Sequence, residues 1–176
     1  MELEENITYS FNLKESTTQD YKCCVQIIEW LKRNMESLTD DNNKTLFSKV
    51  NYGYNEETLK GFGKKPVCDV YIDNFDYRSD LTENVPDKVH TFIICYLKGN
   101  MNATYFKACE LTDYLLQEFN TNDSFRELNI HETVGGEILV HKVVRETRVS
   151  DVTLEIIPQG KTYGVLCAFS LEHELY

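Results

Sequence analysis

The fold follows from the C-terminal stretch EILVHKVVRETRVSDVTLEIIPQGKTYGVLCAFSLEHELY, residues 137–176. Apolar residues run or alternate over strand-length segments here, which predicts strands over 138–145 and 149–157. The intervening PQGK (158–161) places proline and glycine where a type I turn favours them. A further strand over 163–172 presents apolar side chains at every second residue, and the chain is expected to end in an antiparallel β-hairpin.

Two more strands and two helices are expected upstream of this hairpin. Pro66 introduces a strand over 67–72, and residues 89–97 are apolar on both faces, as in the central strand of a sheet. Apolar residues recurring at intervals of three and four predict amphipathic helices over 20–38 and 103–119. In the first helix, Ile27 and Trp30 widen the apolar stripe. This extra width favours either a broadly packed core helix or a contact with another subunit.

These elements predict one α+β domain over residues 1–176. We expect a single mixed or mostly antiparallel sheet with the two helices packed on it. Residues 1–15 form an additional strand or an arm, and 39–65 form a long loop, a feature that is often functional in compact domains. Phe92 and Leu116 are expected to be deeply buried in the core.

Charge and composition disfavour several classes of partner. The formal net charge is −11 and the pI is about 4.8, whereas proteins that bind nucleic acid through phosphates need clustered lysine and arginine. No specific nucleic-acid binding is therefore expected. The N-terminus has neither the basic region nor the apolar region of a signal peptide, and no apolar run is long enough for a bilayer. A cytoplasmic protein without a membrane partner is expected.

No catalytic or metal-binding motif interrupts the chain. GFGKK (61–65) lacks the spacing of a phosphate-binding loop, and HETVG (131–135) lacks the second histidine of a zinc protease. The acidic stretch 73–80 lacks the register and the glycine of a calcium-binding loop. The six cysteines show no paired C-x-x-C spacing and are expected to be free core residues. We expect no catalytic residues, no metal and no cofactor, and therefore not an enzyme.

The order of elements resembles that of the tail-terminator and tail-completion proteins of long-tailed phages. The resemblance covers residues 66–176, and it is carried by hydrophobic patterns in PVCDVY (66–71), HTFIICY (90–96), the 103–119 helix and the strand ending near 172. It implies a structural protein of the virion tail, assembled in the host cytoplasm. Such a protein caps the tail tube as a ring, commonly hexameric, and presents the surface that joins the head.

A ring of this kind needs contact surfaces between copies and with the tail tube and head-completion proteins. Strand edges and the polar loops 39–65 and 73–88 are the expected contacts. They supply these candidate interface residues: Tyr52, Tyr54, Phe62, Asp73, Asp76, Tyr77, Arg78 and Asp80. Two alternatives stay open, namely a head–tail connector or other neck protein, and a cytoplasmic α+β enzyme or ligand-binding domain whose site is assembled from scattered residues.

Overall fold

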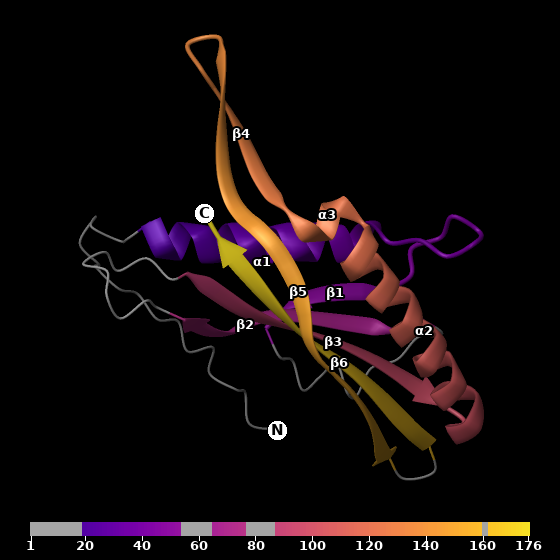
Figure 1. Cartoon of the computed structure of the whole chain (residues 1–176). Coiled ribbons are helices and arrows are strands. Elements are labelled where there is room, and N and C mark those ends of the chain that lie inside the picture. The colour runs from indigo at the N-terminus through magenta and orange to yellow at the C-terminus, as the bar shows by residue number, and fades with distance from the viewer. Residues whose placement is uncertain (1–18, 54–64, 77–86, 160–161) are drawn as a thin grey trace, which may run out of the picture.

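The protein folds around one six-stranded sheet with helices on it (Figure 1). The computed structural model describes residues 19–53, 65–76, 87–159 and 162–176. Its elements in chain order are α1 (Gln19–Ser37), β1 (Lys49–Tyr52), β2 (Val67–Asp76), β3 (Lys88–Gly99), α2 (Met101–Thr121), α3 (Asp123–Arg126), β4 (Leu128–Val134), β5 (Glu137–Gln159) and β6 (Thr162–Leu175).

The sheet has the strand order β1-β2-β3-β6-β5-β4. β1 pairs with β2 in parallel, and all the other neighbours are antiparallel, so the sheet is mixed. The prediction of an α+β fold with a single sheet is confirmed. The prediction that β3 is central also agrees with the structure, because β3 lies between β2 and β6.

Both long helices contribute to one hydrophobic core on the same face of the sheet, which we call the inner face. α1 packs against β1 and β2, while α2 packs against β3, β5 and β6. In α1 the completely buried residues are Ile27, Leu31 and Met35, which are spaced four apart and therefore share one helix face. Ile27 thus belongs to the core, and Trp30 is half-buried beside it. This arrangement matches the broad core helix of the two options that the sequence left open.

The prediction of deep burial for Phe92 and Leu116 is wrong. On β3 the alternate residues Val89, Ile93 and Cys95 are fully buried on the inner face. Phe92 points to the opposite, outer face, where it is half-buried with its ring 5.6 Å from the Tyr71 ring. Leu116 is also half-buried, at the side of the α2 stripe. An apolar run on both faces of a strand does not indicate which face receives the helices.

The two strands predicted over 138–145 and 149–157 are one continuous strand, β5. The polar stretch between them does not break the strand, because β6 continues to pair with it through Thr147 and Arg148. The register shifts at Val144/Glu146 and at Val149/Asp151. Such bulges bend a strand and increase its twist without ending it. The long β5 in Figure 1 curves accordingly.

The structure contains elements that the sequence did not predict. The expected loop 39–65 includes β1 and a tight turn in which the Asp40 carboxylate accepts hydrogen bonds from the Asn42 and Lys44 backbone amides. β4 and the short α3 were also not predicted. The N-terminal strand or arm expected over 1–15 lies outside the described residues. Pro66 directly precedes β2, as predicted.

Gly164 on β6 gives a prediction about packing on the outer face. A Cβ at this position would lie 2.0 Å from the Tyr96 hydroxyl oxygen and 2.5 Å from Cζ of the same ring. Tyr96 is 1% exposed and has little room to move away. We expect Gly164→Ala to lower the free energy of unfolding by about 1–3 kcal/mol, as overpacking does.

Urea denaturation of Gly164→Ala measures this cost, and a double-mutant cycle identifies its origin. In a Tyr96→Leu background the ring is absent, so Gly164→Ala should cost less than it does beside the tyrosine. An equal cost in both backgrounds would show that the close approach to the ring is not the reason for glycine.

Candidate assembly surfaces

A two-stranded ribbon projects from the body of the protein. β4 pairs with β5 from Leu128↔Val144 to Val134↔Glu137, whereas β6 pairs with β5 only from Val144 onward. Residues 128–144 therefore form a hairpin that extends beyond the rest of the sheet, as Figure 1 shows above α1 and α3. We call this hairpin the arm.

The tip of the arm is a two-residue turn of glycines. Gly135 has φ of 61° and Gly136 has φ of 90°. Positive φ at both central positions is the requirement of a type I′ turn, whose twist matches that of the flanking strands. Glycine meets this requirement without steric cost. The sequence therefore specifies a tight and regular end to the arm.

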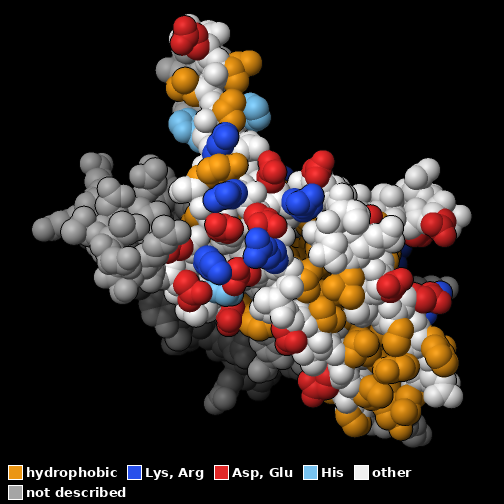
Figure 2. Space-filling view, in the orientation of Figure 1, with side chains coloured by type: hydrophobic (Ala, Val, Ile, Leu, Met, Phe, Trp, Pro, Cys, Tyr) orange, Lys and Arg blue, Asp and Glu red, His pale blue; other side chains and the backbone are white. Residues whose placement is uncertain are grey.

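The arm exposes large apolar side chains near its tip. Ile138, Leu139 and Val140 are 68%, 44% and 51% exposed. Ile138 and Val140 lie two residues apart and so share one face of the ribbon, while Leu139 lies on the other. Figure 2 shows hydrophobic side chains on this projection. A two-stranded hairpin is at best marginally stable in water when it has no face to pack on.

A second group of exposed apolar side chains lies where α2 begins and β5 ends. The Cys167 thiol on β6 lies 3.7 Å from the Ala108 carbonyl oxygen of α2, and Cys167 pairs with Leu154 on β5, so the first half of α2 lies beside this part of the strands. Figure 2 shows hydrophobic side chains gathered at this end of the molecule, away from the arm. We call this surface the α2–β5 patch, and it consists of Met101, Tyr105, Phe106, Leu154, Ile156 and Tyr163, which are 36% to 67% exposed.

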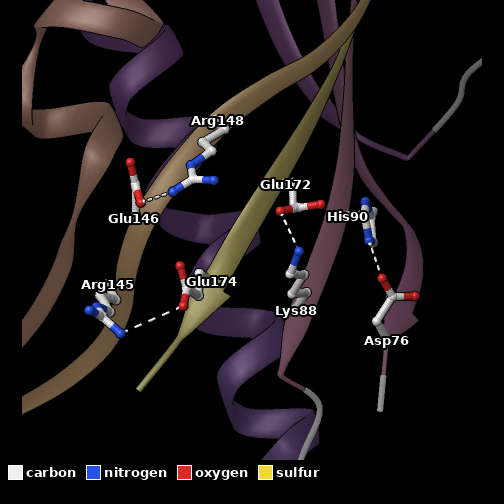
Figure 3. Close-up of polar contacts among 8 residues, drawn as sticks. All are labelled: Asp76, Lys88, His90, Arg145, Glu146, Arg148, Glu172 and Glu174. Carbon is white, nitrogen blue, oxygen red and sulfur yellow. Dashed lines mark hydrogen bonds and ion pairs between the residues drawn. The ribbon is translucent and has the colours of Figure 1, made fainter. Parts of the chain in front are cut away.

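The outer face near the base of the arm carries charged side chains from β2, β3, β5 and β6 (Figure 3). A hydrogen bond to Glu172 raises the pKa of Lys88, and a hydrogen bond from Arg148 lowers the pKa of Glu146. Ion pairs exposed in this way contribute little to stability. The pairs and their N···O distances are Lys88–Glu172 at 2.8 Å, His90–Asp76 at 2.9 Å, Arg145–Glu174 at 3.6 Å and Arg148–Glu146 at 2.6 Å.

The buried cysteines and the buried histidine belong to the core and stay uncharged. Burial raises the pKa of Cys95 well above its ordinary value and that of Cys167 to about 12, so both thiols stay protonated and are poor nucleophiles. His173 is fully buried between two threonine hydroxyls, and burial lowers its pKa to about 3. Among the described residues, no cluster of three or more metal-ligating side chains occurs, and no helix is long and apolar enough to cross a membrane.

The predicted contact residues are only partly described by the structure. Tyr52 lies at the end of the edge strand β1, is 57% exposed, and has the Lys32 ammonium 5.0 Å from its ring centroid. Asp73 and Asp76 are exposed on β2, and Asp76 pairs with His90. The structure therefore places these three at one side of the sheet. The remaining five lie outside the described residues: Tyr54, Phe62, Tyr77, Arg78 and Asp80.

The comparisons with known proteins leave function to be inferred from this geometry. No protein-family model matches the chain, and no curated protein matches it significantly. One solved protein chain aligns with 91% of this chain and 98% of its own length, at 11% sequence identity and a TM-score of 0.39.

The arm was not among the predicted contact surfaces, although the sequence carries a signal for it. Two glycines between apolar runs are a pattern typical of a two-residue hairpin. The three consecutive apolar residues 138–140 beyond this pair indicate a strand that is not simply half-buried. No local pattern indicates that the apolar side chains near the tip of this hairpin are left in solvent.

Proposed function

We propose that this protein is a structural assembly protein of the tail-terminator kind, which forms a ring on the end of a phage tail tube and presents the surface that joins the head. The observation that carries the proposal is the arm, a β-ribbon that leaves the body and exposes Ile138, Leu139 and Val140. Exposing these side chains to water does not stabilise a monomer. A partner that covers them removes apolar surface from water, and this stabilises the complex.

A ring also requires two different surfaces on each copy. Closed rings are built from heterologous contacts, in which one patch of a subunit meets a different patch of the next. The arm and the α2–β5 patch are two such apolar surfaces at separate ends of the molecule (Figure 2). The exposed Tyr52, Asp73 and Asp76 at the β1–β2 side of the sheet are proposed as further contacts with virion neighbours.

The link to phage tails comes from the order of elements, which resembles that of tail terminators over residues 66–176. By this resemblance the ring is hexameric, its partners are the tail tube and head-completion proteins, and it is assembled in the host cytoplasm. The net charge of −11 is compatible with this role, since a ring with an acidic lumen would let DNA pass without binding it. In this role the protein is not an enzyme and uses no cofactor.

Deletion of the gene from the phage or provirus that carries it, followed by electron microscopy of the particles, tests the proposal. We expect overlong tails, with or without heads. Tails of normal length without heads would indicate a neck protein instead. Normal tails joined to heads would contradict both roles.

Complementation with arm variants connects this phenotype to the structure. The double variant Ile138→Thr, Val140→Thr keeps β-branched side chains on the strand but removes apolar surface, and it should fail to restore normal particles. Glu29→Gln, an exposed residue of α1 outside both apolar surfaces, is the control and should restore them.

A further inference from the structure

Beside the α2–β5 patch, the edge of β5 is open. β6 pairs with β5 as far as Gln159, but β4 pairs with it only between Glu137 and Val144. Within the described residues, the second edge of β5 beyond Val144 has no strand beside it. Residues 153–156 are exposed, which agrees with an uncovered edge. Such an edge presents a row of backbone N–H and C=O groups that can pair with a strand from another chain.

We infer that the α2–β5 patch and the open β5 edge over residues 151–157 receive the arm of a second copy of this chain. This inference rests on the proposed ring and names the contact that builds it. In the described part of the chain the arm offers open edges too, because β4 is the last strand of the sheet and β5 has no β6 neighbour before Val144. Pairing an arm edge with the β5 edge adds strands to the sheet of the next copy.

The side chains of the two surfaces fit this pairing. A strand added beside β5 places every second side chain over the face where Leu154 and Ile156 lie. The arm has Ile138 and Val140 at this spacing. Phe106, 67% exposed, and Tyr105, whose ring lies 6.3 Å from that of Phe106, supply an aromatic wall from α2. Pro158 follows this segment and limits the added ladder, because proline has no N–H to donate.

Charge also favours the arm as the occupant. The chain as a whole is acidic, so two copies generally repel each other. Residues 128–144 carry a net charge of only −1, from Glu132 and Glu137 against Lys142. The receiving surface is acidic, since residues 101–113 and 151–157 together carry Lys107 against Glu110, Asp113, Asp151 and Glu155. The arm is therefore close to neutral and meets less repulsion at this surface than the more acidic parts of the chain would.

Two complementary variants separate a head-to-tail contact from a symmetric one. The first variant, Ile138→Asp with Val140→Asp, has a disabled arm and an intact patch. The second variant, Phe106→Asp with Leu154→Asp, has a disabled patch and an intact arm. Neither should self-associate, but a mixture should form a one-to-one complex, because the arm of the second binds the patch of the first.

Nuclear magnetic resonance at millimolar concentration detects this complex even when it is weak. With the first variant ¹⁵N-labelled and the second unlabelled, we expect shifts confined to the start of α2 and residues 151–157, and slower exchange of alternate β5 amides. With the labelling reversed, the shifts should move to the arm. Gln117→Glu is the matched control: it adds a negative charge at an exposed residue of α2, roughly three turns beyond Phe106 and outside both surfaces, and it should leave complex formation within about twofold of the parent.

Three results would overturn the inference: no shifts in the mixture at millimolar concentration, shifts at other surfaces, or self-association of the second variant through its intact arm. Failure of this interface can be distinguished from failure of the proposed tail role. Normal particles after gene deletion, together with a one-to-one complex, would reject the tail role and keep the interface. A ring of full-length protein that persists in both variants would keep the role and reject this interface.

Discussion

Replacing Phe169 with alanine is expected to lower the free energy of unfolding by about 3–5 kcal/mol, as truncation of a fully buried phenylalanine does. Phe169 on β6 is 0% exposed. Its ring meets that of Phe119 on α2 edge-to-face at 5.3 Å, and Phe119 meets Phe125 on α3 at 5.2 Å. Removing the Phe169 ring leaves a cavity where the sheet meets α2 and α3.

Phe92 provides the matched control for this prediction. It lies on the neighbouring strand β3 but points to the outer face, where it is half-buried. Less apolar surface returns to water when it is truncated, so Phe92→Ala should cost roughly half as much as Phe169→Ala. Urea denaturation of both variants measures the difference. Equal costs would mean that the inner face is not the main core of the protein.

Acidification is expected to destabilise the protein through His173. Its imidazole lies within 2.7 Å of the Thr91 hydroxyl at Nε2 and 2.8 Å of the Thr147 hydroxyl at Nδ1, with the Trp30 ring edge-on at 5.8 Å. A neutral imidazole donates one of these hydrogen bonds and accepts the other. Burial disfavours the charged form, and this lowers the pKa from 6.5 to about 3.

The sign of the pH dependence follows from this lowered pKa. Below about pH 6.5 the unfolded chain takes up a proton at His173 while the folded protein does not, so stability is complete above this pH and falls as the pH falls toward 3. Where the unfolded chain binds one proton more than the folded protein, the free energy of unfolding falls by about 1.4 kcal/mol per pH unit. Because this difference develops only below about pH 6.5, the loss between pH 7 and pH 5 is about 2 kcal/mol. Few carboxylates with ordinary pKa values titrate in this interval.

Urea denaturation at pH 7, 6 and 5 tests this dependence in the native protein and in His173→Gln. Glutamine keeps one donor and one acceptor but does not titrate, so most of the slope should disappear even if the variant is less stable at every pH. His131→Gln removes an exposed histidine of the arm and should keep the slope. An unchanged slope in His173→Gln would assign the acid sensitivity to other groups.

Local patterns predicted much of the fold. The α1 and α2 stripes, β2 after Pro66, the central β3 and the return of β6 each follow from residues that are close in sequence. Local patterns failed where pairing with a neighbouring strand decided whether a segment forms a strand. The polar residues 146–148 suggested a break, but pairing with β6 continues through them as β5 bends. β1 is only four residues long and gains its place from the parallel pairing with β2.

The sequence by itself determined the period of the two long helices and of β2, β3 and β6, the interruption at Gly135–Gly136, and the acidic character of the chain. These depend on the stereochemistry of neighbouring residues and on composition. Only the tertiary structure decided which apolar surfaces are covered. Phe169 and Ile138 are both apolar residues in strands, yet one is 0% and the other 68% exposed. The difference arises because α2 packs over β6, whereas Ile138 lies near the tip of the arm, where the described side chains 138–140 stay exposed. Packing partners that are distant in sequence leave no local pattern.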